Sequence, residues 1–285
     1  MSRELGVRPR GPYSLAFSAR LSSDATRTFR DGVMTARVAG SVVRARQSPD
    51  GTVWLRGEPA AVERLRWILA LDDDHSEFLR AVRSDPLLGR ASRELRGLRP
   101  VRVGSVAQAL LRALCGQLIE AKRARRLEQK LIRATTAAGP EGLHDAPTSA
   151  DLARWSAAEL RALGLHARRA AALLRICRSF DLERLHSSST AAVAARLERE
   201  RCLGPWSVGV VCLQGLGRYE YGLVGDLGLV KLLTAMRGGG ARVETGETAA
   251  LLRPYGEWAG LASIYLLAGF GRGLIPLDAD VTLAA

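Results

Sequence analysis

The sequence predicts a mainly α-helical protein with a small α+β domain at its N-terminus. Within residues 13–70, apolar residues form short β-type runs around a hairpin turn. From about residue 73 onward, apolar residues recur almost everywhere at the spacing of a helix that buries one face. We therefore expect a small α+β domain over residues 1–72 and a helical domain over residues 73–285.

The strand-like part of the first domain comes before residue 57. Residues 13–21 alternate loosely between apolar and polar side chains, and residues 40–47 and 52–56 are two short β-type runs. The sequence Ser-Pro-Asp-Gly at 48–51 separates the two runs and is typical of a tight turn. This pattern predicts a β-hairpin.

A helix over residues 59–71 completes the first domain. One face of it carries the apolar residues Val62, Leu65, Ile68 and Leu69. Asp72, Asp73 and Asp74 follow, and we expect these carboxylates to cap helix ends in a solvated linker rather than to hold a metal ion.

The second domain is predicted to be a compact bundle of many helices. Short loops, several with Pro or Gly, separate the helices, and no repeat of solenoid length is present. The predicted helices cover residues 75–84, 86–96, 105–118, 121–137, 150–155, 157–163, 166–179, 191–197, 207–214, 227–236, 247–252 and 257–268.

The charge of the chain is strongly positive. Its 285 residues include 42 Lys and Arg against 29 Asp and Glu, a formal net charge of +13. Arginine dominates the basic residues, and its guanidinium group binds phosphate with two hydrogen bonds, so a nucleic-acid partner is indicated. The alternative is a GC-rich genome whose codons favour Arg, without any nucleic-acid binding.

The residues that bind metals or form disulfides are scattered. The four cysteines and four histidines show neither a CxxC pair nor the spacing of a metal site. The N-terminus lacks the apolar stretch of a signal peptide, and no run approaches the ~20 apolar residues that span a bilayer. These features predict a reduced, cytoplasmic protein of bacterial type, associated with the nucleoid, with neither a metal nor a membrane partner.

The most informative segment is residues 196–236. A turn at 202–207 precedes an apolar helix, and the unpaired first-turn N–H groups of a helix bind phosphate. Asp226 opens the next apolar helix, where an isolated Asp is usually only an N-cap. Because this Asp follows a phosphate-binding type of turn, the segment indicates a protein that holds a DNA strand and acts on one nucleotide.

The helix predicted over residues 105–118 ends in a polar amide, Gln117, and an apolar tip, Leu118, close to basic residues. Such a pair suits a wedge that enters a DNA base stack, although a Leu at a helix end is usually core. Arg168 and Arg169, near the start of another predicted helix, are interpreted as a solvated face.

Four motifs in the helical part occur in the order of a known family. They are the hairpin RCLGPWS at 201–207, the segment LVGDLGLVK at 223–231, LRP at 98–100 with GQLIE at 116–120, and RPYGEW at 253–258. With weaker matches at 12–15 and 49–53, they resemble the DNA-3-methyladenine glycosylase II family of the helix–hairpin–helix DNA glycosylase superfamily. The likeness spans nearly the whole chain.

The resemblance implies the multi-helix fold of that superfamily and a monofunctional DNA glycosylase of base-excision repair. Such an enzyme hydrolyses the N-glycosidic bond of alkylated purines of the 3-methyladenine type in damaged double-stranded DNA, here as a monomer. Asp226 would be the catalytic carboxylate, and Leu118 the wedge. The implied base pocket contains Trp206, Tyr255, Trp258 and Phe17, and the implied DNA contacts are Gln117, Leu118, Leu203, Gly204, Ser207 and Lys231.

The resemblance also bears on cofactors and on strand cleavage. Bifunctional members of the superfamily carry a nucleophilic Lys where this chain has Trp206, so neither a Schiff base nor strand cleavage is expected. No cofactor is implied, although in relatives the hairpin carbonyls can hold a monovalent cation against a phosphate when DNA is bound.

The chain departs from the family pattern at four positions. Cys202 stands for a Gly, Arg201 for a Pro, Glu120 for a small hydroxyl residue and Val230 for a basic residue. Two alternatives therefore stay open. One is a glycosylase for a deaminated or oxidised base, and the other is a non-catalytic or weakly catalytic protein that binds DNA lesions.

Overall fold

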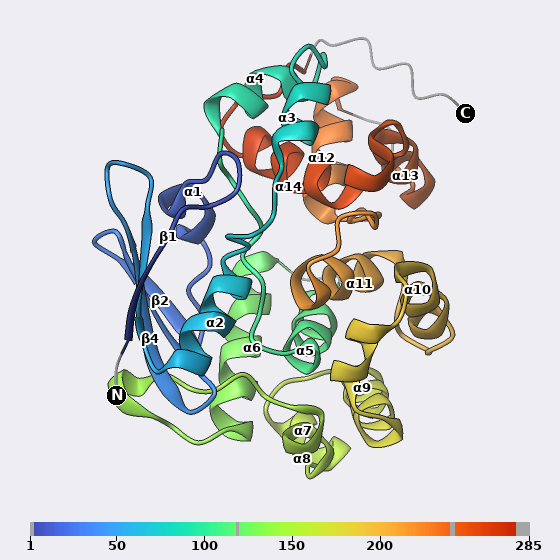
Figure 1. Cartoon of the computed structure of the whole chain (residues 1–285). Coiled ribbons are helices and arrows are strands. Elements are labelled where there is room, and N and C mark those ends of the chain that lie inside the picture. Colours follow the sequence, from blue (N-terminus) through green and yellow to red (C-terminus); the bar gives the residue numbers. More distant parts are fainter. Residues whose placement is uncertain (1–2, 118–119, 240–242, 278–285) are drawn as a thin grey trace.

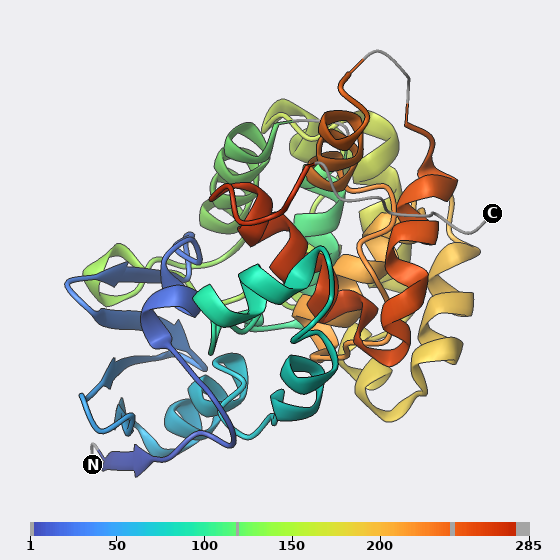
Figure 2. The ribbon, with the colours of Figure 1, turned by 90° about the horizontal axis from the view of Figure 1, so that it is seen from above.

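The computed structural model describes residues 3–117, 120–239 and 243–277. It is mainly helical, with one small antiparallel sheet at the N-terminus, as predicted (Figure 1). Seen from above, the sheet lies to one side of the helical part (Figure 2).

The sheet has five antiparallel strands in the order β1-β5-β4-β3-β2. The turn at 48–51 joins β4 to β5 as predicted, with Gly51 at φ +88° and the Asp50 carboxylate accepting the Thr52 N–H. Helix α2 covers the inner face, so Val62 and Leu65 pack on strand side chains in one core. The elements are β1 Arg3–Val7, β2 Arg27–Arg30, β3 Val33–Val38, β4 Ser41–Gln47, β5 Val53–Gly57 and α2 Pro59–Ile68.

The loose alternation at 13–21 was a wrong indication of extended chain. The structure has a one-turn helix there, α1 Leu15–Ala19, because the Ser14 hydroxyl caps the Phe17 N–H at 3.2 Å and the Gln47 side chain accepts from the Leu15 N–H at 2.9 Å. Strands β1, β2 and β3 were not predicted, although the Asp31-Gly32 turn between β2 and β3 is of the kind that joins two strands of a hairpin.

Each predicted helix of the second part coincides with an observed helix, with small shifts at the ends. The bounds are α3 Ser76–Ala81, α4 Leu88–Glu94, α5 Val106–Gly116, α6 Ala121–Thr135, α7 Ser149–Ala153, α8 Ala157–Ala162, α9 Ala167–Ser179, α10 Thr190–Glu198, α11 Pro205–Val210, α12 Leu227–Met236, α13 Thr245–Leu252 and α14 Ala259–Phe270. The sequence did not indicate the π-helical segment η3 Val211–Leu216, which prolongs α11, or the 3₁₀ segment η4 Arg253–Trp258 before α14.

The helical part has two apolar cores. The first surrounds α5 and includes α6 to α11, and the second surrounds α14 and includes α3, α4, α12 and α13. Figure 1 shows the two groups one above the other. A small cluster of Ala113, Val210, Leu213 and Leu223, called here the linking cluster, joins the two cores.

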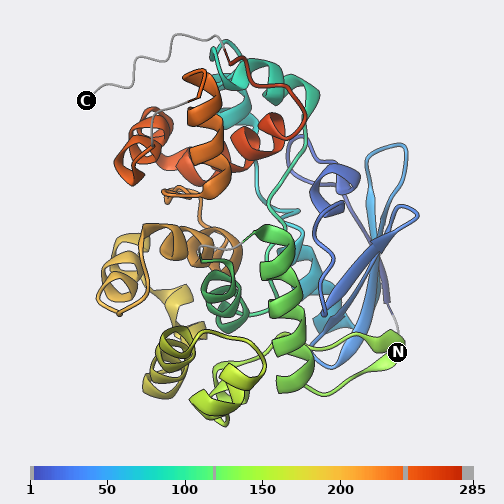
Figure 3. The ribbon, with the colours of Figure 1, turned by 180° about the vertical axis from the view of Figure 1, so that it is seen from behind.

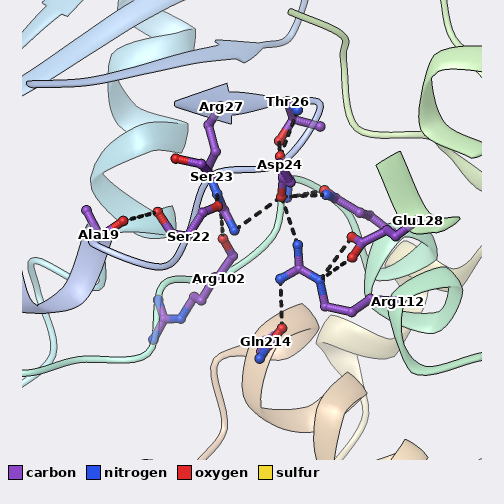
Figure 4. A network of polar contacts seen from close by, with 12 residues as sticks. Ala19, Ser22, Ser23, Asp24, Thr26, Arg27, Arg102, Arg112, Glu128 and Gln214 are labelled. Carbon is purple, nitrogen blue, oxygen red and sulfur yellow. Dashed lines mark hydrogen bonds and ion pairs between the residues drawn. The ribbon is translucent and has the colours of Figure 1, made fainter. Parts of the chain in front are cut away.

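A buried network of charges connects the sheet domain to the first helical core (Figure 4). Asp24, in the loop before β2, lies 2.8 Å from the Arg112 guanidinium of α5 and 3.6 Å from that of Arg27. Arg112 also donates to Glu128 of α6 at 2.9 Å and to the side chain of Gln214 in η3 at 2.8 Å. Buried charges are tolerated only when they are paired in this way, so the network fixes how these four segments pack.

Among the described residues, the helices are either too short or too polar to cross a membrane.

Candidate active site

The hairpin lies between α10 and α11. Cys202 has φ +76°, in the left-handed region where the sequence indicated that Gly is preferred. Gly204 is the N-cap of α11, and Pro205 takes the first helical position, where its missing N–H costs nothing. No atom lies within 4 Å of the point that a Gly204 Cβ would occupy, so the turn is open on that side.

Gln117 fastens the hairpin to the end of α5. Its side-chain amide donates to the Cys202 carbonyl at 2.5 Å and to the Ser207 hydroxyl at 2.9 Å. Ser207 is buried, and Leu203 packs in the first helical core. The side chains of Leu203 and Ser207 thus face inward, so that DNA contact at these two positions would involve the backbone.

Asp226 is the N-cap of α12. One carboxylate oxygen accepts the Gly228 N–H at 2.7 Å, and the other accepts the indole N–H of Trp206 at 2.8 Å. Gly225, at φ +83°, turns the chain just before Asp226, and its N–H donates to Thr248 at 2.7 Å. The two hydrogen bonds to Asp226 hold its carboxylate in one orientation between the hairpin helix and α12.

The Trp206 indole lies against the last turn of α5. A Cβ at Gly116 would lie 2.5 Å from Cη2 of the indole, so only Gly permits this approach. The ring also packs on the linking cluster, together with Ile264 and Leu267 from α14. The structure therefore brings together Trp206 and Asp226, which stand in two separate motifs of the sequence.

The wall beside this pair was not predicted. Leu267 of α14 packs closely against the first turn of α12, since a Cβ at Gly228 would meet its Cδ2. Leu267 and Ile264 are both only partly buried. Because Ile and Leu in an apolar helix normally indicate core, the sequence held no signal that these two border the site.

The other aromatic residues predicted for the base pocket lie in the second helical core. Trp258 stacks on Tyr219 with ring centroids 6.1 Å apart, and the Tyr255 hydroxyl lies 3.3 Å from a carboxylate oxygen of Asp85. The Phe17 ring lies 5.4 Å from the Arg272 guanidinium. No described contact joins Phe17, Tyr255 or Trp258 to Asp226, so their role in a pocket stays a prediction.

Lys231 and Leu118 were also predicted to contact DNA. Lys231 is exposed on α12, one and a half turns after Asp226. Leu118, predicted as the wedge, lies outside the described residues.

The predicted linker contains a buried polar cluster that the sequence did not reveal. The Asp73 carboxylate accepts hydrogen bonds from Arg102 and from the Tyr219 hydroxyl, while Asp74 caps Ser76 as expected. His75 is buried against Tyr219, 4.8 Å between ring centroids, and burial lowers its pKa to about 3. This cluster holds the linker against the loop that precedes α12.

Within the described part of the chain, no group of three or more His, Cys, Asp or Glu residues could hold a metal ion. All four cysteines are free thiols, and Cys202 is the exposed one.

Comparisons with known proteins identify relatives of this architecture. No protein-family model matches the chain. A DNA-3-methyladenine glycosylase of Bacillus subtilis (strain 168) is 22% identical over 204 residues, which cover 69% of this chain and 67% of the relative. The solved 3-methyladenine DNA glycosylase from Archaeoglobus fulgidus has a TM-score of 0.80 at 18% identity, over 94% of this chain and 97% of that one.

A second solved structure is nearly as similar in shape. The Clostridium acetobutylicum 8-oxoguanine glycosylase/lyase, in complex with DNA that contains 8-oxoguanine, has a TM-score of 0.78 at 16% identity. The match covers 96% of this chain and 99% of that one. Identities this low show a shared fold rather than a shared substrate.

Proposed function

We propose that this chain, which has the fold of the helix–hairpin–helix DNA glycosylase superfamily, is a DNA glycosylase that removes alkylated purines from damaged double-stranded DNA. The observation that carries the proposal is the Asp226 carboxylate at the N-terminus of α12, hydrogen-bonded at 2.8 Å to the indole of the hairpin helix. Hairpin and carboxylate are thus one connected unit, as a site that grips a strand and reacts at one nucleotide requires.

The chemistry follows from a single carboxylate. The target nucleotide is turned out of the duplex, because its glycosidic bond cannot be reached within the base stack. The bond between C1′ and the base nitrogen breaks, and its electron pair leaves with the base. Asp226 stabilises the positive charge that develops on the sugar. A water oxygen then bonds to C1′ and loses a proton, which yields a free base and an abasic site.

An alkylated purine needs little help in leaving. When N3 or N7 carries a methyl group, the base is cationic and departs as a neutral molecule, so no general acid is required. The wall beside Asp226 suits such a base, since it includes the half-buried aromatic ring of Trp206, and aromatic rings attract cations. Ile264 and Leu267 offer only apolar surface, whereas a site that selects an oxidised base must pair its extra polar atoms.

A second candidate is a glycosylase for an oxidised purine, favoured by the likeness in shape to the 8-oxoguanine glycosylase/lyase. A lyase step is not expected, because Trp206 occupies the hairpin position where bifunctional members carry the nucleophilic Lys. Borohydride trapping on duplexes that contain 8-oxoguanine or an abasic site tests for the lyase step, and release of free 8-oxoguanine tests for the oxidised substrate. A covalent adduct would favour the second.

The decisive experiment measures release of free methylated base from alkylated duplex DNA under single-turnover conditions. We expect Asp226→Asn to slow release by about 10²-fold or more, by analogy with the loss of one electrostatic group from a preorganised site. Asn is as good an N-cap as Asp, so α12 should stay folded. Asp181→Asn is the matched control, because Asp181 likewise caps a helical segment, the 3₁₀ segment η2 Leu182–Ser187.

Each outcome decides between the functions. Release by the wild type and by Asp181→Asn, but not by Asp226→Asn, supports the proposal. Release that Asp226→Asn leaves undiminished removes Asp226 from its role. Binding of alkylated duplex without any release by the wild type favours a non-catalytic lesion-binding protein.

A further inference from the structure

Helix α6 carries a strongly basic surface. Its fifteen residues include six basic side chains, all of them exposed. We call this surface the α6 basic face; it consists of Lys122, Arg123, Arg125, Arg126, Lys130 and Arg133. Among the described residues, none of these six side chains takes part in an ion pair.

Four of the six basic residues point directly away from the protein. At about 100° per residue, Lys122, Arg126, Lys130 and Arg133 fall within about 80° of one another on the helix surface. The buried residues of α6, which are Glu128, Leu131, Ile132 and Thr135, fall on the opposite side. These four residues therefore form a stripe on the α6 basic face that is exposed to solvent along the helix.

The acidic residue within α6 does not neutralise the stripe. Glu128 is buried and hydrogen-bonded to Arg112 of α5 at 2.9 Å. Solubility needs only a mixture of charges, whereas like charges three and four residues apart destabilise a helix. A surface of one sign with its acid turned inward is better explained by an anionic partner than by solvation.

The position of α6 indicates which partner this is. Gln117, at the end of α5, donates to the hairpin carbonyl of Cys202, and α6 begins four residues later. Figure 3 shows α6 on the near side of the molecule, running away from α11 alongside the sheet domain. Fifteen residues extend roughly 22 Å, which corresponds to about six base pairs of duplex.

We propose that the α6 basic face binds the phosphate backbone of the duplex on one side of the target nucleotide, beyond the hairpin. This proposal rests on the proposed function in taking duplex DNA as the partner, and it adds where one flank of that duplex lies. The contacts are to phosphates, so they strengthen binding to any sequence and do not select the lesion.

The test measures how binding of an undamaged, fluorescein-labelled duplex depends on salt between 50 and 200 mM NaCl. The triple variant Arg126→Gln/Lys130→Gln/Arg133→Gln alters the end of α6 furthest from the hairpin. Each lost phosphate contact lowers the slope of log K against log[salt] by about 0.9, so we expect a decrease of about 2 to 3. Circular dichroism confirms that the variant is folded.

The control removes the same charge elsewhere. Arg83, Arg90 and Arg96 are exposed on and beside α4, a helix that packs in the second helical core. The triple variant Arg83→Gln/Arg90→Gln/Arg96→Gln should keep the wild-type slope. If both triple variants lose the same slope, only net charge matters, and if neither loses any, the altered α6 residues make no phosphate contacts; either result shows that the proposal is wrong.

Duplexes with one shortened flank locate the contact. Trimming one particular flank below about six base pairs should weaken wild-type binding, and the α6 triple variant should not respond to that trimming. If the variant responds to both flanks as the wild type does, the proposal fails. Failure of the proposed function is a separate result, because it would appear as absent base release by the wild type, whatever the salt slopes are.

Discussion

Gly116→Ala should damage the site while leaving the fold intact. The added Cβ would lie 2.5 Å from Cη2 of Trp206 and 3.3 Å from its Cζ3. Carbon atoms in contact need about 3.5–4.0 Å, so the indole must move by about 1 Å. Its N–H now lies 2.8 Å from the Asp226 carboxylate, and a shift of that size places it beyond the limit of about 3.2 Å for a hydrogen bond.

The expected magnitude follows from the hydrogen bond that is lost. A hydrogen bond to a charged group contributes about 1.5–3 kcal/mol. If Trp206 holds Asp226 in its reactive orientation, single-turnover release of methylated base should slow by about 10- to 100-fold. Ala favours a helix over Gly by up to about 1 kcal/mol, which offsets the disturbed packing, so the melting temperature should change by only a few degrees.

Two further variants make the result interpretable. Gly246→Ala, in α13, adds a methyl group where nothing lies within 4 Å, and it should release base at the wild-type rate. Trp206→Phe removes the donor directly, so the double variant with Gly116→Ala should be little slower than the slower single variant. Wild-type release by Gly116→Ala, or full multiplication of the two defects, would refute the reasoning.

Three other predictions concern stability. Cys202→Gly removes the Cβ of a residue in the left-handed region, which relieves backbone strain. The entropy that Gly adds to the unfolded chain offsets part of this gain, so the free energy of unfolding in urea titrations should rise by about 0.5–1 kcal/mol. His75 has a pKa near its ordinary 6.5 in the unfolded chain but about 3 in the folded protein, because burial, Arg99 and Arg102 disfavour its cation. As the pH falls, the unfolded state therefore binds the proton first. Stability that is present above pH 6.5 is lost as the pH falls towards 3. Between pH 6.5 and 4.5 this amounts to about 2–3 kcal/mol, which His75→Phe should abolish, as seen in urea titrations at several pH values. Arg112→Leu leaves two buried carboxylates without their shared cation and should cost about 3–5 kcal/mol in urea unfolding.

Each of the three has a result that contradicts it. Cys202→Ala keeps the Cβ, so a gain as large as that of Cys202→Gly would show that strain is not the cause. A His75→Phe variant that keeps the acid dependence of the wild type would place the responsible group elsewhere. Arg154→Leu breaks an exposed pair and should cost less than about 1 kcal/mol; an equal loss from Arg112→Leu would mean that burial of the network is unimportant.

The sequence predicted the helices well because their apolar residues repeat with one period along most of the chain. It predicted β4 and β5 because a Pro-Asp-Gly turn separates them. Strand β1 escaped detection because it pairs with β5, which is distant in sequence. Strands β2 and β3 were missed although the two-residue turn Asp31-Gly32 that joins them is a typical hairpin signal. The π-helical geometry of η3 leaves no residue signature either.

Part of the candidate site was predictable because two of its residues belong to recognisable sequence motifs. Asp226 and Trp206 stand in motifs, and the structure joins them by one hydrogen bond. Leu267 and Ile264 have no signal of their own, because an aliphatic residue at a site border and one in a core look alike in sequence. Gly116 could be noted as part of a motif, but only the structure gives its reason, which is the indole that lies against it.

The charged network around Arg112 has a consequence for the modularity of the protein. Asp24 belongs to the sheet domain, whereas Arg112, Glu128 and Gln214 belong to helices around the hairpin. A fragment that begins after residue 72 would keep Arg112 but lose Asp24, one of the two carboxylates that pair with it. The Arg112 charge would then be only partly compensated within an apolar interior. The sheet domain is therefore not an appendage that can be deleted or exchanged, and we expect the helical body to fold only in its company.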